Sequence, residues 1–481
     1  MKKNVLFLGL LGLALNAQAQ SGPWVPVNTV NSQAFAPGHR VTDVKTISPT
    51  VAWLVAEESS TAGYPNAFFV TNNAAGDQFS FGTTIPANGA QNFQTGNISG
   101  VSATAAVAAT YPQAGGGGEI IRTTNAGVSW SKVSTASQFN GNIGGFCDFV
   151  HMFSATEGVA LGDPTNGSFE ILRTIDGGAT WTRVPAANMP TPLANEYGLT
   201  RSFFAQGNTI WAGMGSSVSS DPVRVLRSTD KGVTWTASPV TTLLGGINRL
   251  AFKDANNGIA YSVTVANGAV TAVNLIRTAD GGATWSAITP VNTNSGSFFR
   301  YDVDAVDGRY YSVGQRFPVT SPAATAYDFG ASYSTDGINW TNTNRSQGYF
   351  AFDLVTGATT GTAAGYAGTA TDANGVGGIF KATNANIIAA TRDGALESAL
   401  TVFPNPSATG IFNVDLGSNL KAGAKLTVMD ALGRQVKSQT LTAATVGART
   451  FALDLSTEKA GVYMLQIQTE AGLATRKLVV E

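Results

Sequence analysis

Seven residues in five separate parts of the chain are the candidates for chemistry. An arginine guanidinium can hold a carboxylate through two parallel hydrogen bonds. Carboxyl groups, with a tyrosine beside one of them, can cleave a glycosidic bond. The same residues could instead line a polar, solvated surface without chemistry, and the sequence leaves both interpretations open. The candidates are Arg40, Asp148, Glu196, Tyr197, Arg249, Arg300 and Tyr301.

One further phrase has the composition of a metal site. Asp302, Asp304 and Asp307 lie close together, as acids do in calcium loops, but not at the spacing of an EF-hand. Asp307-Gly308 also suits a hairpin turn, which is the interpretation we favour. His39 and His151 are the only two histidines, and no metal-ligand spacing links them. We therefore predict no metal, no cofactor and no catalytic residue, with calcium at the three aspartates as the alternative.

Composition excludes several classes of function. The formal net charge is −1 and 12% of the residues are charged, so no basic field is present to attract nucleic acid. Cys147 is the only cysteine, which excludes an intrachain disulfide. Two lysines, an apolar run over 5–15 and Ala17-Gln18-Ala19 predict a signal peptide over residues 1–19. No later segment has the length and hydropathy of a transmembrane helix.

The elements that would position the candidates are repeats. RTTNAGVSW, RTIDGGATW, RSTDKGVTW, RTADGGATW and YSTDGINW end at tryptophans that lie 50 to 55 residues apart. Two weaker copies flank them, and each copy follows a segment that is typical of two strands around a turn. A period of this size with strand-like content predicts propeller blades of four strands each. We expect an all-β fold: a seven-bladed β-propeller over residues 20–392.

The last copy lacks its aromatic residue. Residues 22–27, Gly-Pro-Trp-Val-Pro-Val, match the end of the other copies. We therefore predict that Trp24–Val27 pairs with a strand that begins near Ile379 and closes the ring, which would remove two open sheet edges. The alternative is that Ile387–Ala390 completes the blade.

The repeated phrase resembles the Asp-box of sialidase-like and other BNR-repeat propellers. The resemblance implies a turn formed by an acid or amide and a tryptophan that packs between sheets, so these residues are expected to be structural. It also places the seven candidates at the mouth of the channel. The expected structural residues are Asn125, Trp130, Asp176, Trp181, Asp230, Trp235, Asp280, Trp285, Asp336 and Trp340.

The C-terminal residues form a separate pattern. Alternating segments are broken by Pro404-Asn405-Pro406, Gly433-Arg434 and Gly461-Val462-Tyr463, and the chain ends in Lys-Leu-Val-Val-Glu. This order resembles the C-terminal sorting domain of the Bacteroidota type IX (Por) secretion system. We expect a linker over 393–398 and a small β-sandwich sorting domain over 399–481. The resemblance implies export through the inner membrane to the cell surface or the extracellular space, with the secretion machinery as a partner.

These observations predict a monomeric, exported binding or structural module for glycan or protein ligands, not an enzyme. The alternative is a sialidase-like or xyloglucanase-like glycoside hydrolase that uses carboxylates at the channel mouth. Sialidases usually have six blades and a Phe-Arg-Ile-Pro motif, which this chain lacks. The fold itself hosts unrelated activities and does not decide between the two.

Overall fold

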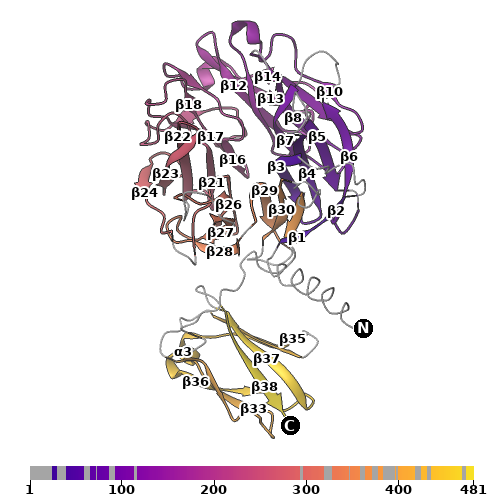
Figure 1. The fold of residues 1–481 in the computed structure, drawn as a ribbon, viewed down its shortest axis with the longest axis vertical. Coiled ribbons are helices and arrows are strands. Elements are labelled where there is room, and N and C mark those ends of the chain that lie inside the picture. Colours follow the sequence, from indigo (N-terminus) through magenta and orange to yellow (C-terminus); the bar gives the residue numbers. More distant parts are fainter. Residues whose placement is uncertain are drawn as a thin grey trace, which may run out of the picture. The chain divides into compact units, whose positions relative to one another are not determined.

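The computed structural model divides into two compact units, Met1–Ile387 and Ile388–Glu481, and each is described by itself (Figure 1). The predicted signal peptide, most of the predicted linker and residues 387–390 lie outside the described residues. The described residues are 24–29, 39–58, 66–71, 73–85, 93–112, 116–292, 296–318, 328–345, 347–357, 363–370, 378–382, 396, 399–417, 424–430, 435–468 and 473–481.

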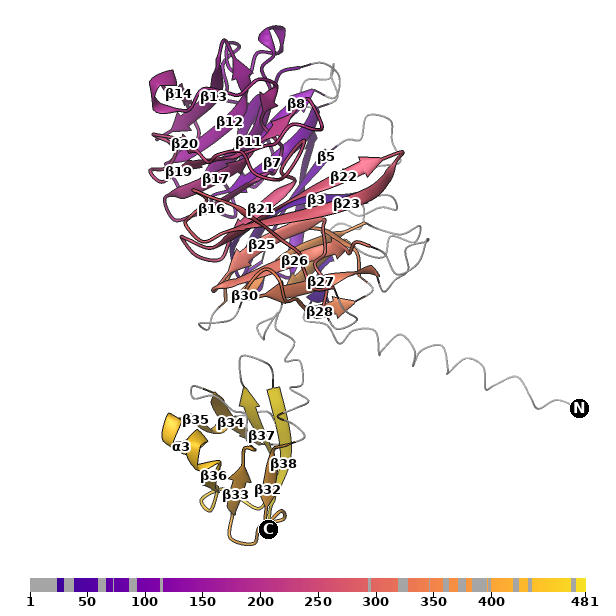
Figure 2. The same ribbon diagram turned by 90° about the vertical axis from the view of Figure 1, so that its left-hand side faces the viewer.

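The described part of the first unit consists of sheets whose strands are antiparallel, except for the parallel pair β2 (Asn28–Thr29) and β6 (Gln78–Ile85). It contains seven sheets of four or five strands and one of two strands, which confirms the prediction of an all-β propeller fold. In six of the seven, the four main strands follow one another in chain order, and the first of the four lies beside the neighbouring sheets. Figure 2 shows these sheets from the side.

The strand bounds follow the chain. The first sheet contains β3 (His39–Ser48), β4 (Val51–Glu58), β5 (Asn66–Thr71) and β6 (Gln78–Ile85), with β2 (Asn28–Thr29) parallel to β6. The second contains β7 (Phe93–Gly100), β8 (Ala106–Pro112), β9 (Glu119–Thr123) and β10 (Ser131–Lys132). The third contains β11 (Cys147–Met152), β12 (Gly158–Thr165), β13 (Ser168–Thr174) and β14 (Thr182–Arg183).

The fourth sheet contains β16 (Phe203–Gln206), β17 (Thr209–Gly213), β19 (Val225–Ser228) and β20 (Thr236–Ala237), next to the short pair β15 (Glu196–Tyr197) and β18 (Gly215–Ser216). The fifth contains β21 (Arg249–Phe252), β22 (Gly258–Ala266), β23 (Ala269–Thr278) and β24 (Ser286–Ile288). The sixth contains β25 (Asp302–Val306), β26 (Arg309–Gln315), β27 (Phe329–Ser334) and β28 (Thr341–Arg345). Two 3₁₀ turns precede the third and fourth sheets, η1 (Gly141–Ile143) and η2 (Ala186–Asn188).

The seventh sheet joins the two ends of the unit. It contains β29 (Tyr349–Thr356), β30 (Ala363–Thr369), β31 (Ile379–Ala382) and β1 (Trp24–Pro26). Trp24 pairs with Ala382 and Pro26 with Phe380, and Val27 N donates to Ile379 O at 3.0 Å. The predicted ring closure is therefore confirmed. Trp24 is buried, and its ring centroid lies 5.5 Å from that of Tyr349.

Side chains of the innermost strands connect successive sheets into a ring. An innermost strand presents one unpaired edge, whose N–H groups need acceptors. In four of the seven sheets a polar side chain of one innermost strand accepts such an N–H from the next. We call these residues the inner acceptors: Asp43 to Ile98 N, Asn97 to Val150 N, Ser99 to Met152 N, Asp302 to Phe352 N, Asp304 to Leu354 N and Asp353 to Thr46 N.

The remaining junctions of the ring use aromatic and ionic contacts. Phe149 of β11 stacks on Phe203 of β16 with centroids 4.3 Å apart. Phe204 of β16 lies 6.4 Å from Phe252 of β21. Arg249 Nε of β21 donates to Asp302 Oδ1 of β25 at 3.2 Å. The ring is thereby continuous from β3 back to β29.

The second unit is a small two-sheet structure. Its buried side chains come from both sheets and form one core that includes Phe412, Val428, Leu453 and Leu465, as expected when two sheets pack face to face. One short helix, α3 (Ala443–Ala448), was not predicted. The sheets are β32 (Thr401–Phe403), β33 (Ile411–Asp415) and β36 (Thr450–Asp454), and β35 (Gln435–Thr440), β34 (Lys425–Asp430), β37 (Gly461–Gln468) and β38 (Leu473–Val480).

Candidate functional site

Four of the seven candidates lie together at one pocket of the first unit. Arg40 belongs to β3, Arg249 begins β21, and Arg300 and Tyr301 directly precede β25. All four line a pocket of about 310 Å³, which we call the mouth pocket. Three different sheets therefore contribute guanidinium groups to one space. The complete lining is Arg40, Val41, Thr42, Arg201, Asn248, Arg249, Tyr261, Val263, Arg300, Tyr301 and Phe350.

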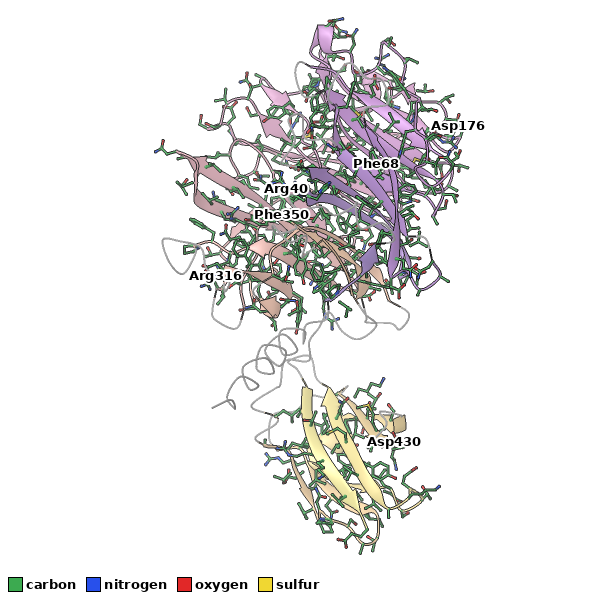
Figure 3. The ribbon with its side chains drawn as sticks, turned by 45° about the vertical axis from the view of Figure 1, so that its right-hand side comes forward. Arg40, Phe68, Asp176, Arg316, Phe350 and Asp430 are labelled. Atoms are coloured by element: carbon green, nitrogen blue, oxygen red, sulfur yellow. The ribbon has the colours of Figure 1, made fainter. Side chains whose placement is uncertain are left out.

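An aromatic pair holds two of these arginines. The rings of Tyr301 and Phe350 stack with centroids 5.3 Å apart and an interplanar angle of 5°. The Arg40 guanidinium lies 5.6 Å from the centroid of Phe350, and that of Arg300 lies 5.2 Å from Tyr301. Figure 3 shows Arg40 beside Phe350 at the inner part of the unit. Cation–π attraction fixes flexible side chains in such positions, so the stack orders the rim of the pocket.

Arg201 is a fourth arginine in the mouth pocket, and the sequence reasoning missed it. It lies just before β16 with φ of +59°, a region that residues other than glycine rarely adopt. Its guanidinium donates to the carbonyl of Thr42, more than 150 residues away. Burial, and then the neighbouring Arg249, lower the pKa of Arg201. Its position before an innermost strand, like that of Arg300 before β25, is the signal that could have identified it.

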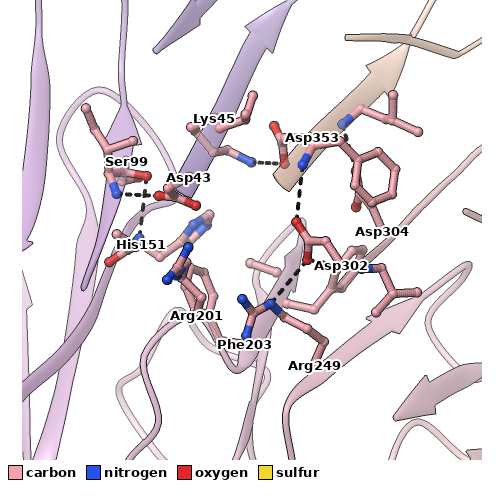
Figure 4. A pocket seen from close by; sticks show the side chains of 18 of the residues that line it. Asp43, Lys45, Ser99, His151, Arg201, Phe203, Arg249, Asp302, Asp304 and Asp353 are labelled. Carbon is pink, nitrogen blue, oxygen red and sulfur yellow. Dashed lines mark hydrogen bonds and ion pairs between the residues drawn. The ribbon is translucent and has the colours of Figure 1, made fainter. Parts of the chain in front are cut away.

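A second, inner cavity of about 160 Å³ lies in the ring, and Arg201 and Arg249 line it too (Figure 4). Its other charged residues include Asp43, Lys45 and Asp353. Burial raises the pKa of Asp43 to about 7, although Arg201 opposes the shift. Burial and then Lys45 lower the pKa of His151 to about 3. The cavity therefore holds carboxyl groups and a histidine whose ionisation burial suppresses.

The three aspartates weighed as a calcium site have other partners. Asp302 and Asp304 are inner acceptors, and Asp307 accepts a hydrogen bond from Thr356 Oγ1 at 2.9 Å. Asp307 and Gly308 have φ of 51° and 74°, as a two-residue hairpin turn requires. Across the described ranges we find no group of three or more His, Cys, Asp or Glu residues that could hold a metal ion.

The other three candidates do not line the mouth pocket. Glu196 is buried and accepts two hydrogen bonds from Arg224, from Nε and Nη2, both at 2.8 Å. Asp148 is 2% exposed, and burial, and then Asp163, raise its pKa well above the usual range. Tyr197 pairs with Gly215 in the short sheet beside the fourth. The acids of the predicted constellation are therefore separated from its arginines.

The Asp-box residues lie at the outer ends of the sheets, where Figure 3 shows Asp176. Asp176 Oδ1 accepts from Thr180 N at 2.9 Å and from Thr174 Oγ1 at 2.8 Å. Hydrogen bonds from Thr180 and Thr174 lower its pKa to about 2. Gly178 follows with φ of +80°, and a Cβ there would meet Val107. Turns of the same kind contain Asn125, Asp230, Asp280 and Asp336.

The Asp-box tryptophans lie between sheets. Trp181 is buried, its Nε1 donates to Gly178 O at 3.2 Å, and its ring joins a core cluster with Val107 of β8 and Val150 of β11. Two neighbouring sheets therefore share one tryptophan. The corresponding residues in other clusters are Trp130, Trp235, Trp285 and Trp340.

Comparison with known proteins identifies the second unit. Residues 401–481 match the family model of the secretion system C-terminal sorting domain. The tail is a sorting domain. It marks the protein for type IX secretion to the cell surface or extracellular space and implies contact with that machinery. Within the part of the chain that is described, no helix has the length and apolar character to cross a membrane.

Three solved structures are similar to this chain at low sequence identity, and no curated protein sequence matches it. YCF48 from Cyanidioschyzon merolae is 15% identical, with 74% of this chain and 98% of that one covered and a TM-score of 0.47. A GH74 enzyme of Niastella koreensis is 14% identical over 92% and 66%, with a TM-score of 0.43. PorZ of Porphyromonas gingivalis is 11% identical over 90% and 64%, with a TM-score of 0.36. These likenesses carry no conclusion about activity.

Proposed function

We propose that the protein acts outside the cell as a binding module that takes a glycan or protein ligand at the mouth pocket. The observation that carries this proposal is the convergence of Arg40, Arg249, Arg300 and Tyr301 on one pocket of about 310 Å³. Concave spaces with a few convergent polar groups are the usual places for ligands. The sorting domain supports an extracellular ligand, because it directs the chain outside the cell.

The separation of acids from arginines favours binding over hydrolysis. Glycoside cleavage needs two carboxyl groups on opposite sides of the bond, about 5–10 Å apart. Glu196 is engaged by Arg224, and Asp148 is buried. Among the described lining residues of the mouth pocket there is no carboxylate. The pocket therefore offers a substrate positive charge and hydrogen-bond donors without a paired acid and base.

Ligand arrays test the proposal directly. The full chain is labelled and applied to arrayed glycans and to a peptide library, in parallel with Tyr301→Ala and with Asp176→Ala as a folded control far from the pocket. We expect saturable binding that Tyr301→Ala weakens and Asp176→Ala leaves unchanged. Binding that neither variant alters would place the ligand elsewhere and overturn the proposal. Turnover of fluorogenic sialosides or β-glucans by the wild-type chain, lost in Asp43→Asn, would establish the hydrolase alternative instead.

A further inference from the structure

The mouth pocket separates positive from negative charge. Arg40, Arg201, Arg249 and Arg300 line it, and its described lining contains no carboxylate. The carboxylates that neighbour these arginines do not line it: Asp43 and Asp302 line the inner cavity, and Glu57 forms an ion pair with Arg40. Arg249 Nε donates to Asp302, whereas Arg300 donates to the neutral amide of Gln315. Four cationic groups thus line one space whose described lining has no carboxylate, and Arg40 and Arg249 each have an acidic partner outside that lining.

Two of these arginines are held at a cost in free energy. Arg201 has a left-handed backbone conformation, and its Nε is buried without a hydrogen-bond partner among the described residues. The Nε of Arg300 is in the same condition. A backbone outlier and incompletely bonded buried donors both destabilise the folded chain. Arg201 also lies near the like-charged Arg249, a repulsion that the neighbouring Asp43 and Asp302 oppose.

The geometry of the cluster suits an anion. Guanidinium groups present planar pairs of donors that match the two oxygens of a carboxylate. The stack of Arg40, Phe350, Tyr301 and Arg300 holds two of the four groups in place before a ligand arrives. Preorganisation of this kind reduces the conformational entropy that binding would otherwise cost.

The surroundings favour a saccharide over a peptide. Peptides commonly bind by adding a strand to an open sheet edge. Here the inner acceptors already bind N–H groups of the innermost strands β3, β7, β11 and β29. The other polar side chains of the lining are the hydroxyls of Thr42, Tyr261 and Tyr301 and the amide of Asn248. Hydroxyl and amide groups complement sugar hydroxyls.

We infer that the ligand of the mouth pocket is an acidic saccharide, a glycan that contains uronic acid, whose carboxylate lies between Arg40, Arg201, Arg249 and Arg300. This inference rests on the proposed function and specifies its ligand. The carboxylate accepts hydrogen bonds from the guanidinium groups, and the hydroxyl and amide side chains contact the remaining ring atoms.

The test compares each acid with its neutral counterpart. Oligogalacturonate and alginate oligosaccharides, and the same oligosaccharides after reduction of their carboxyl groups to alcohols, are titrated into the full chain by calorimetry. We expect at least one acid to bind about tenfold more tightly than its reduced form, as loss of a charge-assisted hydrogen bond predicts. Its affinity should fall as salt concentration rises.

Matched variants locate the binding. Arg40→Gln and Arg300→Gln should each weaken binding of the acid about tenfold, whereas Arg122→Gln, an Asp-box arginine, should not. Thermal melts establish that each variant is folded. Equal binding of acid and reduced forms at the mouth pocket would overturn this inference but leave the proposed function intact. If acidic peptides bind tightly and none of the saccharides binds, this inference is likewise overturned and the proposed function stands. Absence of any ligand affected by Arg40→Gln, Arg300→Gln or Tyr301→Ala would overturn both.

Discussion

The Asp-box turns and the channel mouth are both rich in polar residues, but the hydrogen-bond partners of these residues differ. Asp176 and its counterparts accept hydrogen bonds from residues within the same short turn. At the mouth pocket, by contrast, Arg201 donates to Thr42, and in the inner cavity Lys45 donates to Asp353, across large distances in sequence. Local partners can be copied in every repeat. Distant partners arise once, so the outer turns form the scaffold and the mouth provides what is particular to this protein.

The two regions also differ in strain. The Asp-box positions with positive φ are mostly glycine, such as Gly178 and Gly282, where the conformation costs little. At the mouth, Arg201 adopts positive φ without that advantage. Natural sequences tend to break local rules at functional positions. We therefore expect the ligand to bind at the mouth and not at the Asp-box turns.

Ring closure sets the largest expected effect. Trp24→Ala removes a buried ring that packs against Tyr349 in the sheet that joins the two ends of the unit. We expect a loss of about 3–5 kcal/mol in the free energy of unfolding, because a large cavity remains. Denaturant unfolding measures it. Val25→Ala, on the exposed side of the same strand, is the control and should change little. Equal small effects at both positions would contradict closure through Trp24.

An inner acceptor should matter more than an outer aspartate. Asp353→Ala removes the acceptor of Thr46 N at 2.6 Å and the partner of Lys45 Nζ at 3.0 Å. Because it leaves a partly buried N–H and ammonium unpaired, we expect a loss of about 2–3 kcal/mol. Asp353→Asn keeps an acceptor oxygen and should lose less. Denaturant unfolding of the wild type and the two variants measures these losses. If Asp353→Ala is as stable as the wild type, the inner acceptors do not stabilise the ring.

The sequence predicted the repeated part of the molecule well because its signals are local. Asp, Gly and Trp in one phrase specify a turn and its packing, so the strands, the all-β class and the closure by Trp24 could be inferred. The mouth was predicted only in part. Arg40, Arg249 and Arg300 were among the candidates because they lie at or just before the start of innermost strands. Glu196 was misplaced because its partner Arg224 lies on another loop, and no local pattern encodes that pairing.

Arg201 and the inner acceptors show the same limit. Asp43, Asn97 and Asp353 lie in segments that alternate polar and apolar residues, as many half-buried strands do. Their function appears only when strands about 50 or 300 residues apart become neighbours. The positive φ of Arg201 likewise has no signature in its residue type.

Loss of one Asp-box carboxylate should have a smaller effect on stability. Asp176→Ala deprives Thr180 N and Thr174 Oγ1 of their acceptor, but the turn is exposed and water can replace part of the bonding. We therefore expect about 1 kcal/mol in denaturant unfolding. Ligand affinity of the folded variant should equal that of the wild type. A variant with native stability and abolished binding would move the functional site to the Asp-box and reverse the comparison.

The smallest expected effect is a dependence on pH within the inner cavity. Burial raises the pKa of Asp43 from 3.8 to about 7. Between these values the unfolded chain loses the proton that the folded chain keeps, so the stability that Asp43 contributes is present at low pH and is lost as pH rises to 7. His151 acts in the opposite sense, because its pKa falls from 6.5 to about 3 and its contribution is lost as pH falls through that range.

Melting temperatures at pH 5 and pH 7.5 separate the two groups. The melting temperature of the wild type minus that of Asp43→Asn should be larger at pH 5 than at pH 7.5. The difference between wild type and His151→Gln should change in the opposite direction. Asp176, with its lowered pKa of about 2, should give no change over this interval, because it is ionised in both states. If the melting temperatures of the wild type, Asp43→Asn, His151→Gln and Asp176→Ala all change equally between the two pH values, the inner cavity is as well hydrated as the Asp-box turns.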